Sequence, residues 1–193
     1  MRVMKSIEPL EEAIGTLGAV LADRGLHYEL AAIGGGSLML VGLIKRPTKD
    51  VDIVAVIHEG KYQRADPLPQ PLVQAVQEVA ATLGLASDWL NAGPTDLLRF
   101  GLPEGFARRV EIRSYDGLTL HIAGRIDQIH LKFYAAVDQG PKSKHYSDLI
   151  ALRPTRDELL ASARWTLSQD SSPGFKESLK GALEALGVKD AEL

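Results

Sequence analysis

Residues Ala32–Ile53 read AIGGGSLMLVGLIKRPTKDVDI, an apolar run that ends in three glycines and a serine and leads to two aspartates separated by one valine. Glycines between an apolar run and an amphipathic stretch are typical of a tight strand-to-helix turn. In an extended strand, residues two apart share a face, so Asp50 and Asp52 are expected on one face and Val51 and Ile53 on the other. The stretch therefore predicts a strand, a glycine turn, a short helix and a second strand.

The rest of the chain, read outward from this stretch, predicts an α+β fold (α/β in composition) with a mixed β-sheet flanked by helices and a C-terminal helical portion. The Asp116-Gly117 dipeptide predicts a hairpin turn, and Thr155-x-x-Glu158 predicts a helix start with a capping box. We expect a core over 1–124 and a helical portion over 125–193 packed on it, the two together counting also as one domain. The expected elements are helices over 6–25, 37–43, 67–85, 125–137, 144–152, from 155 and over 173–186, strands over 27–34 and 50–57, and a hairpin within 106–124.

Composition limits the kinds of function. The 193 residues include 45% hydrophobic residues, enough for a sizeable core, and 22 Lys and Arg against 25 Asp and Glu, which leaves no global basic field for nonspecific nucleic-acid binding. The cluster of Arg108, Arg109 and Arg113 has two interpretations: a local basic edge that binds RNA, or a charged rim of the hairpin without a binding function. Cysteine is absent, so thiol catalysis and thiolate metal sites are excluded and a reducing cytosol is expected. With no apolar leader or membrane-length segment, we expect a cytoplasmic protein and no membrane partner.

The glycine turn and the aspartate pair each have two interpretations. A glycine turn lets the backbone approach an anion such as phosphate, but it also serves simple packing. Two carboxylates on one strand face repel unless a cation lies between them, and oxygen ligands suit Mg²⁺, whereas a solvent-facing polar strand is the ordinary alternative. The combination favours a metal-nucleotide site.

Glu111 is the candidate for a third carboxylate. It is expected on the first strand of the hairpin, between Val110 and Ile112, where a mixed sheet can bring it beside Asp50 and Asp52. Three carboxylates hold two metal ions, one for the attacking oxygen and one for the leaving pyrophosphate. The alternative is an exposed strand position without function.

These residues together resemble the nucleotidyltransferase superfamily, which has a DNA polymerase beta-like core. Its signature is Gly-Gly or Gly-Ser, a spacer of ten to fourteen residues and Asp-x-Asp, matched here by Gly36-Ser37, twelve residues and Asp50-Val51-Asp52. The form GGGSLML...KRPTKDVDI is similar to the small stand-alone branch that includes the AbiEii-type toxin nucleotidyltransferases, in which an arginine and a threonine or serine precede the aspartates; Arg46 and Thr48 occupy those places.

The same branch has a Lys-x-x-Ala helix and an Asp-Leu pair on a later helix, matched by Lys132, Ala135, Asp148 and Leu149. From periodicity alone, Lys132 lies on a polar helix stripe, and a solvated face is the alternative to a function. The resemblance implies that Lys132 contacts the triphosphate and that Asp148 is its neighbour or a proton acceptor.

The resemblance implies a Mg²⁺-dependent transfer of a nucleoside monophosphate from a nucleoside triphosphate to an acceptor hydroxyl on RNA, such as tRNA, or on protein, as in the toxin of a toxin-antitoxin pair with a cognate antitoxin. Two alternatives stay open: transfer to an aminoglycoside-like small molecule, and a non-catalytic nucleotide-binding or antitoxin-like module. The implied catalytic residues are Asp50, Asp52, Glu111, Lys132 and Asp148, the metal ligands are Asp50, Asp52 and Glu111, and the nucleotide contacts are Gly34, Gly35, Gly36, Ser37, Arg46, Thr48 and Lys132.

Overall fold

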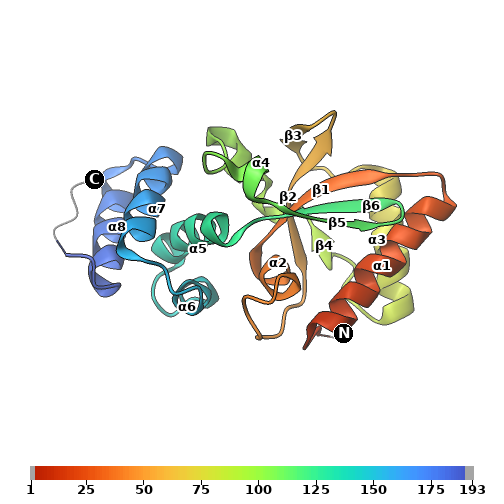
Figure 1. Cartoon of the computed structure of the whole chain (residues 1–193), viewed down its shortest axis with the longest axis horizontal. Helices are drawn as coiled ribbons and strands as arrows, with labels where there is room; N and C mark the ends of the chain where they lie inside the picture. The colour runs from red at the N-terminus through yellow and green to blue at the C-terminus, as the bar shows by residue number, and fades with distance from the viewer. Residues whose placement is uncertain (1–2, 190–193) are drawn as a thin grey trace. The chain divides into compact units, whose positions relative to one another are not determined.

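The computed structural model describes residues 3–189 and has the expected α+β fold, with a mixed sheet and a C-terminal helical portion (Figure 1). The chain divides into two compact units. The sheet unit comprises the residues up to Gly101 together with Ala107–Gly124, and the helical unit comprises Leu102–Phe106 together with the residues from Arg125 onward.

The sheet unit is built on strands in the order β3-β2-β1-β6-β5, with β4 paired to β2. β1 pairs antiparallel with β2 and parallel with β6, and β4 is parallel to β2, so the sheet is mixed as predicted. The strands are β1 (Tyr28–Ile33), β2 (Val51–His58), β3 (Lys61–Arg64), β4 (Leu90–Asn91), β5 (Glu111–Tyr115) and β6 (Leu118–Ile122).

Helices cover one side of this sheet, where α1 contacts β5, β6 and α3 (Figure 1). In α1 the predicted apolar spacing is confirmed, because its apolar stripe is fully buried. Gly18 lies so close to the backbone of Tyr115 that a larger residue would push the helix off the hairpin. The sheet unit's helical segments are α1 (Ile7–Asp23), α2 (Gly34–Leu40), α3 (Gln70–Leu83), the 3₁₀ segment η1 (Gly93–Phe100) and the short α4 (Phe106–Arg109), which begins in the helical unit.

The helical unit consists of α5 (Arg125–Gln139), α6 (Lys144–Ala151), α7 (Arg156–Gln169) and α8 (Pro173–Ala185). α5 is central, because it packs against the other three. The core of the helical unit is formed by the buried apolar side chains of Ile129, Phe133, Ala136, Leu149, Leu159, Ala163, Leu179 and Leu183.

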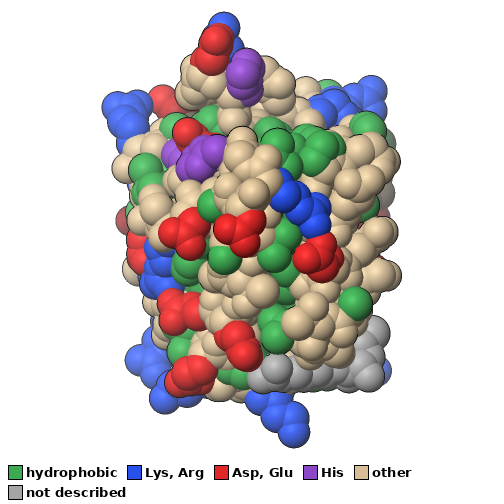
Figure 2. Space-filling view, turned by 90° about the vertical axis from the view of Figure 1, so that its right-hand side faces the viewer, with side chains coloured by type: hydrophobic (Ala, Val, Ile, Leu, Met, Phe, Trp, Pro, Cys, Tyr) green, Lys and Arg blue, Asp and Glu red, His purple; other side chains and the backbone are tan. Residues whose placement is uncertain are grey.

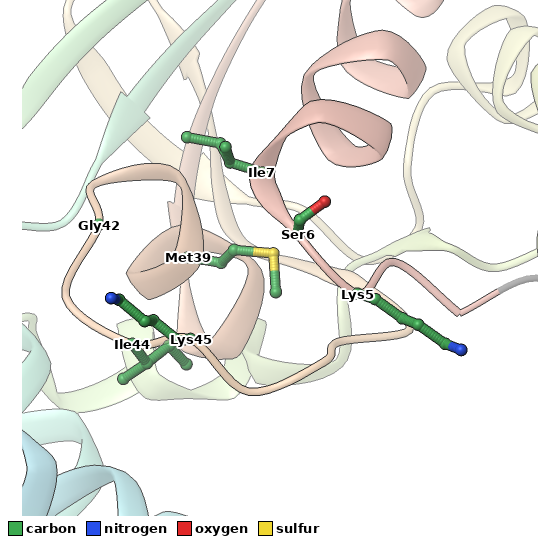
Figure 3. A pocket seen from close by; sticks show the side chains of 7 residues that line it. All are labelled: Lys5, Ser6, Ile7, Met39, Gly42, Ile44 and Lys45. Atoms are coloured by element: carbon green, nitrogen blue, oxygen red, sulfur yellow. The ribbon is translucent and has the colours of Figure 1, made fainter.

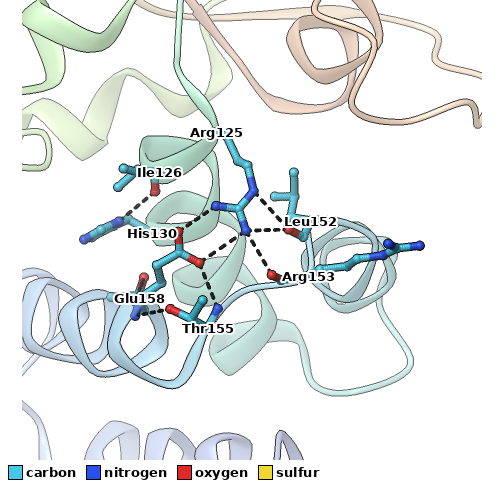
Figure 4. A network of polar contacts seen from close by, with 8 residues as sticks. Arg125, Ile126, His130, Leu152, Arg153, Thr155 and Glu158 are labelled. Carbon is cyan, nitrogen blue, oxygen red and sulfur yellow. Dashed lines mark hydrogen bonds and ion pairs between the residues drawn. The ribbon is translucent and has the colours of Figure 1, made fainter.

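A polar network joins the start of α5 to the connection between α6 and α7 (Figure 4). The Arg125 guanidinium lies 2.6 Å from a Glu158 oxygen and donates to the carbonyls of Leu152 and Arg153 at 2.7 and 2.9 Å. The predicted capping box is confirmed, since Thr155 and Glu158 bond reciprocally. The bonds from Arg125 hold the pKa of the Glu158 carboxyl below its usual value, and the network fixes how three helices meet.

Candidate functional site

The strand register places the glycine turn beside the aspartate pair. Ile33, the last residue of β1, lies opposite Asp52 of β2, and Gly34 begins α2 directly after it. Asp50 precedes the first residue of β2, and both carboxylate residues are partly exposed. The turn and the pair, which are separated in sequence, therefore meet at one end of the sheet.

Two of the glycines are required by this close approach. Gly34 has a φ of +80°, and a β-carbon there would collide with the carboxylate of Asp52. A β-carbon at Gly36 would lie 2.6 Å from the carbonyl oxygen of Asp50. Any larger residue at either position would push α2 away from β2, so the turn is shaped to hold both aspartates against it.

The remaining glycine gives room to an arginine. A β-carbon at Gly35 would lie 2.8 Å from a terminal nitrogen of Arg46. The Arg46 guanidinium also donates to the carbonyl of Pro47 at 3.1 Å. The structure thus brings a cationic side chain onto the glycine turn.

The hydroxyl groups of the two hydroxyl residues in the motif, Ser37 and Thr48, donate to backbone carbonyl oxygens of the chain. Ser37 is fully buried, and its hydroxyl donates to the carbonyl of Ile33 at 2.9 Å. Thr48 is 3% exposed, and its Oγ1 lies 3.2 Å from the carbonyl oxygen and 3.4 Å from Oδ1 of Asp50. Both residues were expected to contact nucleotide; in this structure Ser37 stabilises the start of α2 and Thr48 holds Asp50.

Asn91 lies beside Asp52, although no sequence pattern indicates it. It lies opposite Asp52 in the parallel pairing of β4 with β2, and its Nδ2 is 3.4 Å from Oδ1 of Asp52. The two-residue strand has no hydrophobic period by which it could be found.

Glu111 does not lie beside the aspartates. It is on β5, opposite Ile122 of β6, and both β6 and β1 separate β5 from β2. Three strand spacings amount to roughly 14 Å. The Glu111 carboxylate is half exposed and lies 2.7 Å from the guanidinium of Arg113. The expectation of a shared metal site with Asp50 and Asp52 is corrected: the topology places Glu111 on the far edge of the sheet.

This placement predicts that Glu111→Gln changes nucleotidyl transfer by less than about twofold. Its ion pair with Arg113 is exposed, and such pairs contribute about 0–1 kcal/mol. Steady-state transfer rates of Glu111→Gln and the wild type, with matched circular-dichroism spectra, test this. A loss as large as that of an Asp52 variant would return Glu111 to the site.

Lys132 and Asp148 meet within the helical unit. The Lys132 ammonium lies 2.8 Å from Oδ2 of Asp148, and the two side chains are 4% and 2% exposed. The interpretation of Lys132 as part of a solvated face is wrong, and the expectation that Asp148 is its neighbour is confirmed. The pair joins α5 to α6 through opposite charges.

Asp50 and Asp52 carry the side chains of this site that could hold a divalent cation. Carboxylate oxygens are the donors that Mg²⁺ takes in proteins, and one or two of them suffice when phosphates and water complete its coordination. Within residues 3–189 no group of three or more His, Cys, Asp or Glu side chains gathers to hold a metal ion.

A separate hollow of about 380 Å³ lies between the start of α1 and the loop after α2 (Figure 3). Ile7, Met39 and Ile44 form its apolar wall, while the Lys5 side chain extends away from the other labelled residues. It contains none of the predicted site residues. Its full lining is Lys5, Ser6, Ile7, Met39, Gly42, Ile44 and Lys45.

Charged side chains of both signs lie on the face of the molecule that Figure 2 shows. Figure 2 shows acidic side chains between basic and apolar ones on one face, without a continuous basic area. Arg113 of the suggested basic edge is paired with Glu11 at 2.9 Å and with Glu111, which favours the charged-rim interpretation. In the part of the chain that the structure describes, no helix is both long and apolar enough to cross a membrane.

The geometry thus unites the glycine turn, Arg46, Thr48, Asp50, Asp52 and Asn91 in the sheet unit, and separately pairs Lys132 with Asp148 in the helical unit. Compared with known proteins, the chain matches no family model, no curated protein and no solved structure.

Proposed function

We propose that this protein is a magnesium-dependent nucleotidyltransferase that transfers a nucleoside monophosphate from a nucleoside triphosphate to an acceptor hydroxyl. The observation that supports the proposal best is the packing of the glycine turn against the aspartate pair. A β-carbon at Gly34 would collide with the Asp52 carboxylate. The glycine backbone, which an anion can approach closely, therefore lies next to a carboxylate that can bind a cation. Metal-nucleotide chemistry needs both features together.

In the proposed reaction the acceptor oxygen attacks the α-phosphorus, the bond from that phosphorus to the bridging oxygen of the β-phosphate breaks, and pyrophosphate leaves. The proton of the acceptor hydroxyl goes to water. Bound Mg²⁺ would supply stabilisation of the negative charge that develops on the phosphate oxygens.

The chain's own residues would orient the substrate. Asp50 and Asp52 would hold the cation, with Asp50 fixed by Thr48. Arg46, which lies on the glycine turn, would attract the phosphates through its guanidinium. Lys132, whose ammonium pairs with Asp148 within the helical unit, would contact the triphosphate, as the resemblance implies.

The proposal includes an acceptor on RNA or protein and a role as the toxin of a toxin-antitoxin pair. The test uses four α-labelled nucleoside triphosphates with Mg²⁺, and either total tRNA, cell protein or no acceptor. We expect label from one nucleotide in one fraction, and no label with the Asp50→Ala/Asp52→Ala double variant. Label in a small-molecule product would favour the aminoglycoside-like alternative. Tight Mg-nucleotide binding without any transfer would contradict the proposal and identify a binding module.

A further inference from the structure

β4 brings an uncharged side chain to the place next to Asp52. In the sheet, Asp52 has β1 on one side and β4 on the other, and its partner on β4 is Asn91. Strand β4 is anchored through its preceding residue, since the backbone N–H of Val51 donates to the carbonyl of Trp89 at 2.6 Å. Trp89 is fully buried, so the position of Asn91 is fixed by the core.

The orientation of the Asn91 amide follows from its two contacts. Its Oδ1 accepts the backbone N–H of Gly93 at 2.9 Å, while its Nδ2 lies 3.4 Å from Oδ1 of Asp52. The reversed amide would place a donor against the Gly93 N–H and an acceptor against the carboxylate, so the hydrogen-bond network permits one orientation. Asn91 therefore presents a donor to Asp52 and turns its carbonyl oxygen away.

This arrangement determines the charge of the site. Two carboxylates balance one divalent cation, and the next strand position contributes an amide that donates to one of them. Glu111, the other candidate acid, is on the far edge of the sheet. A second cation next to Asp52 would meet the N–H₂ group of Asn91 in place of a third negative charge, which is electrostatically unfavourable.

Resting on the proposed function, we infer that Asn91 is a positioning residue for Asp52 and that it occupies, without charge, the place of a third metal-binding carboxylate. The sheet unit therefore binds one divalent cation. Replacing Asn91 by aspartate, which has nearly the same shape, creates a three-carboxylate set and a second cation site.

The test is a Mn²⁺ titration of the full chain without nucleotide, in which electron paramagnetic resonance measures free Mn²⁺. We expect one bound Mn²⁺ per chain for the wild type and two for Asn91→Asp. Asn91→Ala should still bind one, but about 10- to 100-fold more weakly, as expected when a residue that orients a metal ligand is lost. Gln63→Glu adds an exposed carboxylate elsewhere in the sheet and should leave the wild-type count unchanged.

The outcomes separate this inference from the function on which it rests. Two Mn²⁺ ions in the wild type, or a count and affinity unchanged in both Asn91 variants, would overturn the inference and leave the proposed function standing. If the wild type binds Mn²⁺ and the Asp50→Ala/Asp52→Ala variant binds it equally tightly, the proposed metal site itself fails. Folding of each variant is followed by circular dichroism.

Discussion

Asp52→Ala is expected to lower nucleotidyl transfer by about 100- to 1,000-fold while the chain stays folded. The carboxylate would hold the cation that balances the phosphate charge, and such stabilisation contributes several kcal/mol to the transition state, where each 1.36 kcal/mol changes the rate about tenfold. Asp50→Ala should have an effect of similar size. The measurement is the single-turnover rate with saturating nucleotide and Mg²⁺.

Stability distinguishes this effect from unfolding. Without a cation, Asp50 and Asp52 repel each other, so removing one carboxylate should leave the melting temperature in chelator unchanged or higher. The control is Asp88→Asn, an exposed aspartate of the same unit, which should keep the wild-type rate. A wild-type transfer rate in Asp52→Ala would reject the assignment of the site.

Lys132→Met is expected to lower the free energy of unfolding by about 3–5 kcal/mol, because it leaves the carboxylate of Asp148 buried without its cation. The two side chains are 4% and 2% exposed, so water cannot replace the lost partner. Urea unfolding followed by circular dichroism measures the loss.

A double variant makes this prediction specific to the pair. Lys132→Met/Asp148→Leu should recover most of the lost stability, since a buried ion pair replaced by apolar side chains of similar size is often neutral or stabilising. Lys144→Met, at an exposed position of α6, is the matched control and should change stability by less than about 0.5 kcal/mol. A loss in the double variant as large as the sum of the two single losses would contradict the ion-pair explanation.

Local patterns predicted most of the secondary structure. The apolar spacing from Leu10 to Leu21 gave α1, the Asp116-Gly117 turn gave the β5-β6 hairpin, and Thr155-x-x-Glu158 gave the start of α7. Each of these depends on contacts between residues a few positions apart, which the sequence displays directly. Strands β3 and β4, the segment η1 and the helix α4, which begins the stretch expected as a hairpin, were not predicted, because they lack a sustained hydrophobic period.

Within the candidate site, the sequence indicated which of its residues lie near one another but not every contact that their side chains make. Three glycines followed by Asp-x-Asp indicated a turn near two carboxylates, and the register of β1 with β2 brings them together. Ser37 was expected to face a phosphate, yet its hydroxyl bonds the carbonyl of Ile33. A hydroxyl near the start of a helix can bond either a ligand or a nearby backbone carbonyl, and the sequence does not show which partner it takes.

The sequence by itself determined the longer helices and strands, the glycines after β1, and an aspartate pair of which Asp50 directly precedes β2 and Asp52 lies on it. Only the tertiary structure decided which side chains lie next to one another. Asn91 donates to Asp52 from 39 positions away in sequence, Glu111 lies three strand spacings from β2, and Lys132 is buried against Asp148. The physical reason is that hydrophobic period shows which face of an element is buried but not which element covers it. Strand neighbours are chosen by the packing of the whole core, where two residues such as Leu90 and Asn91 can complete a site.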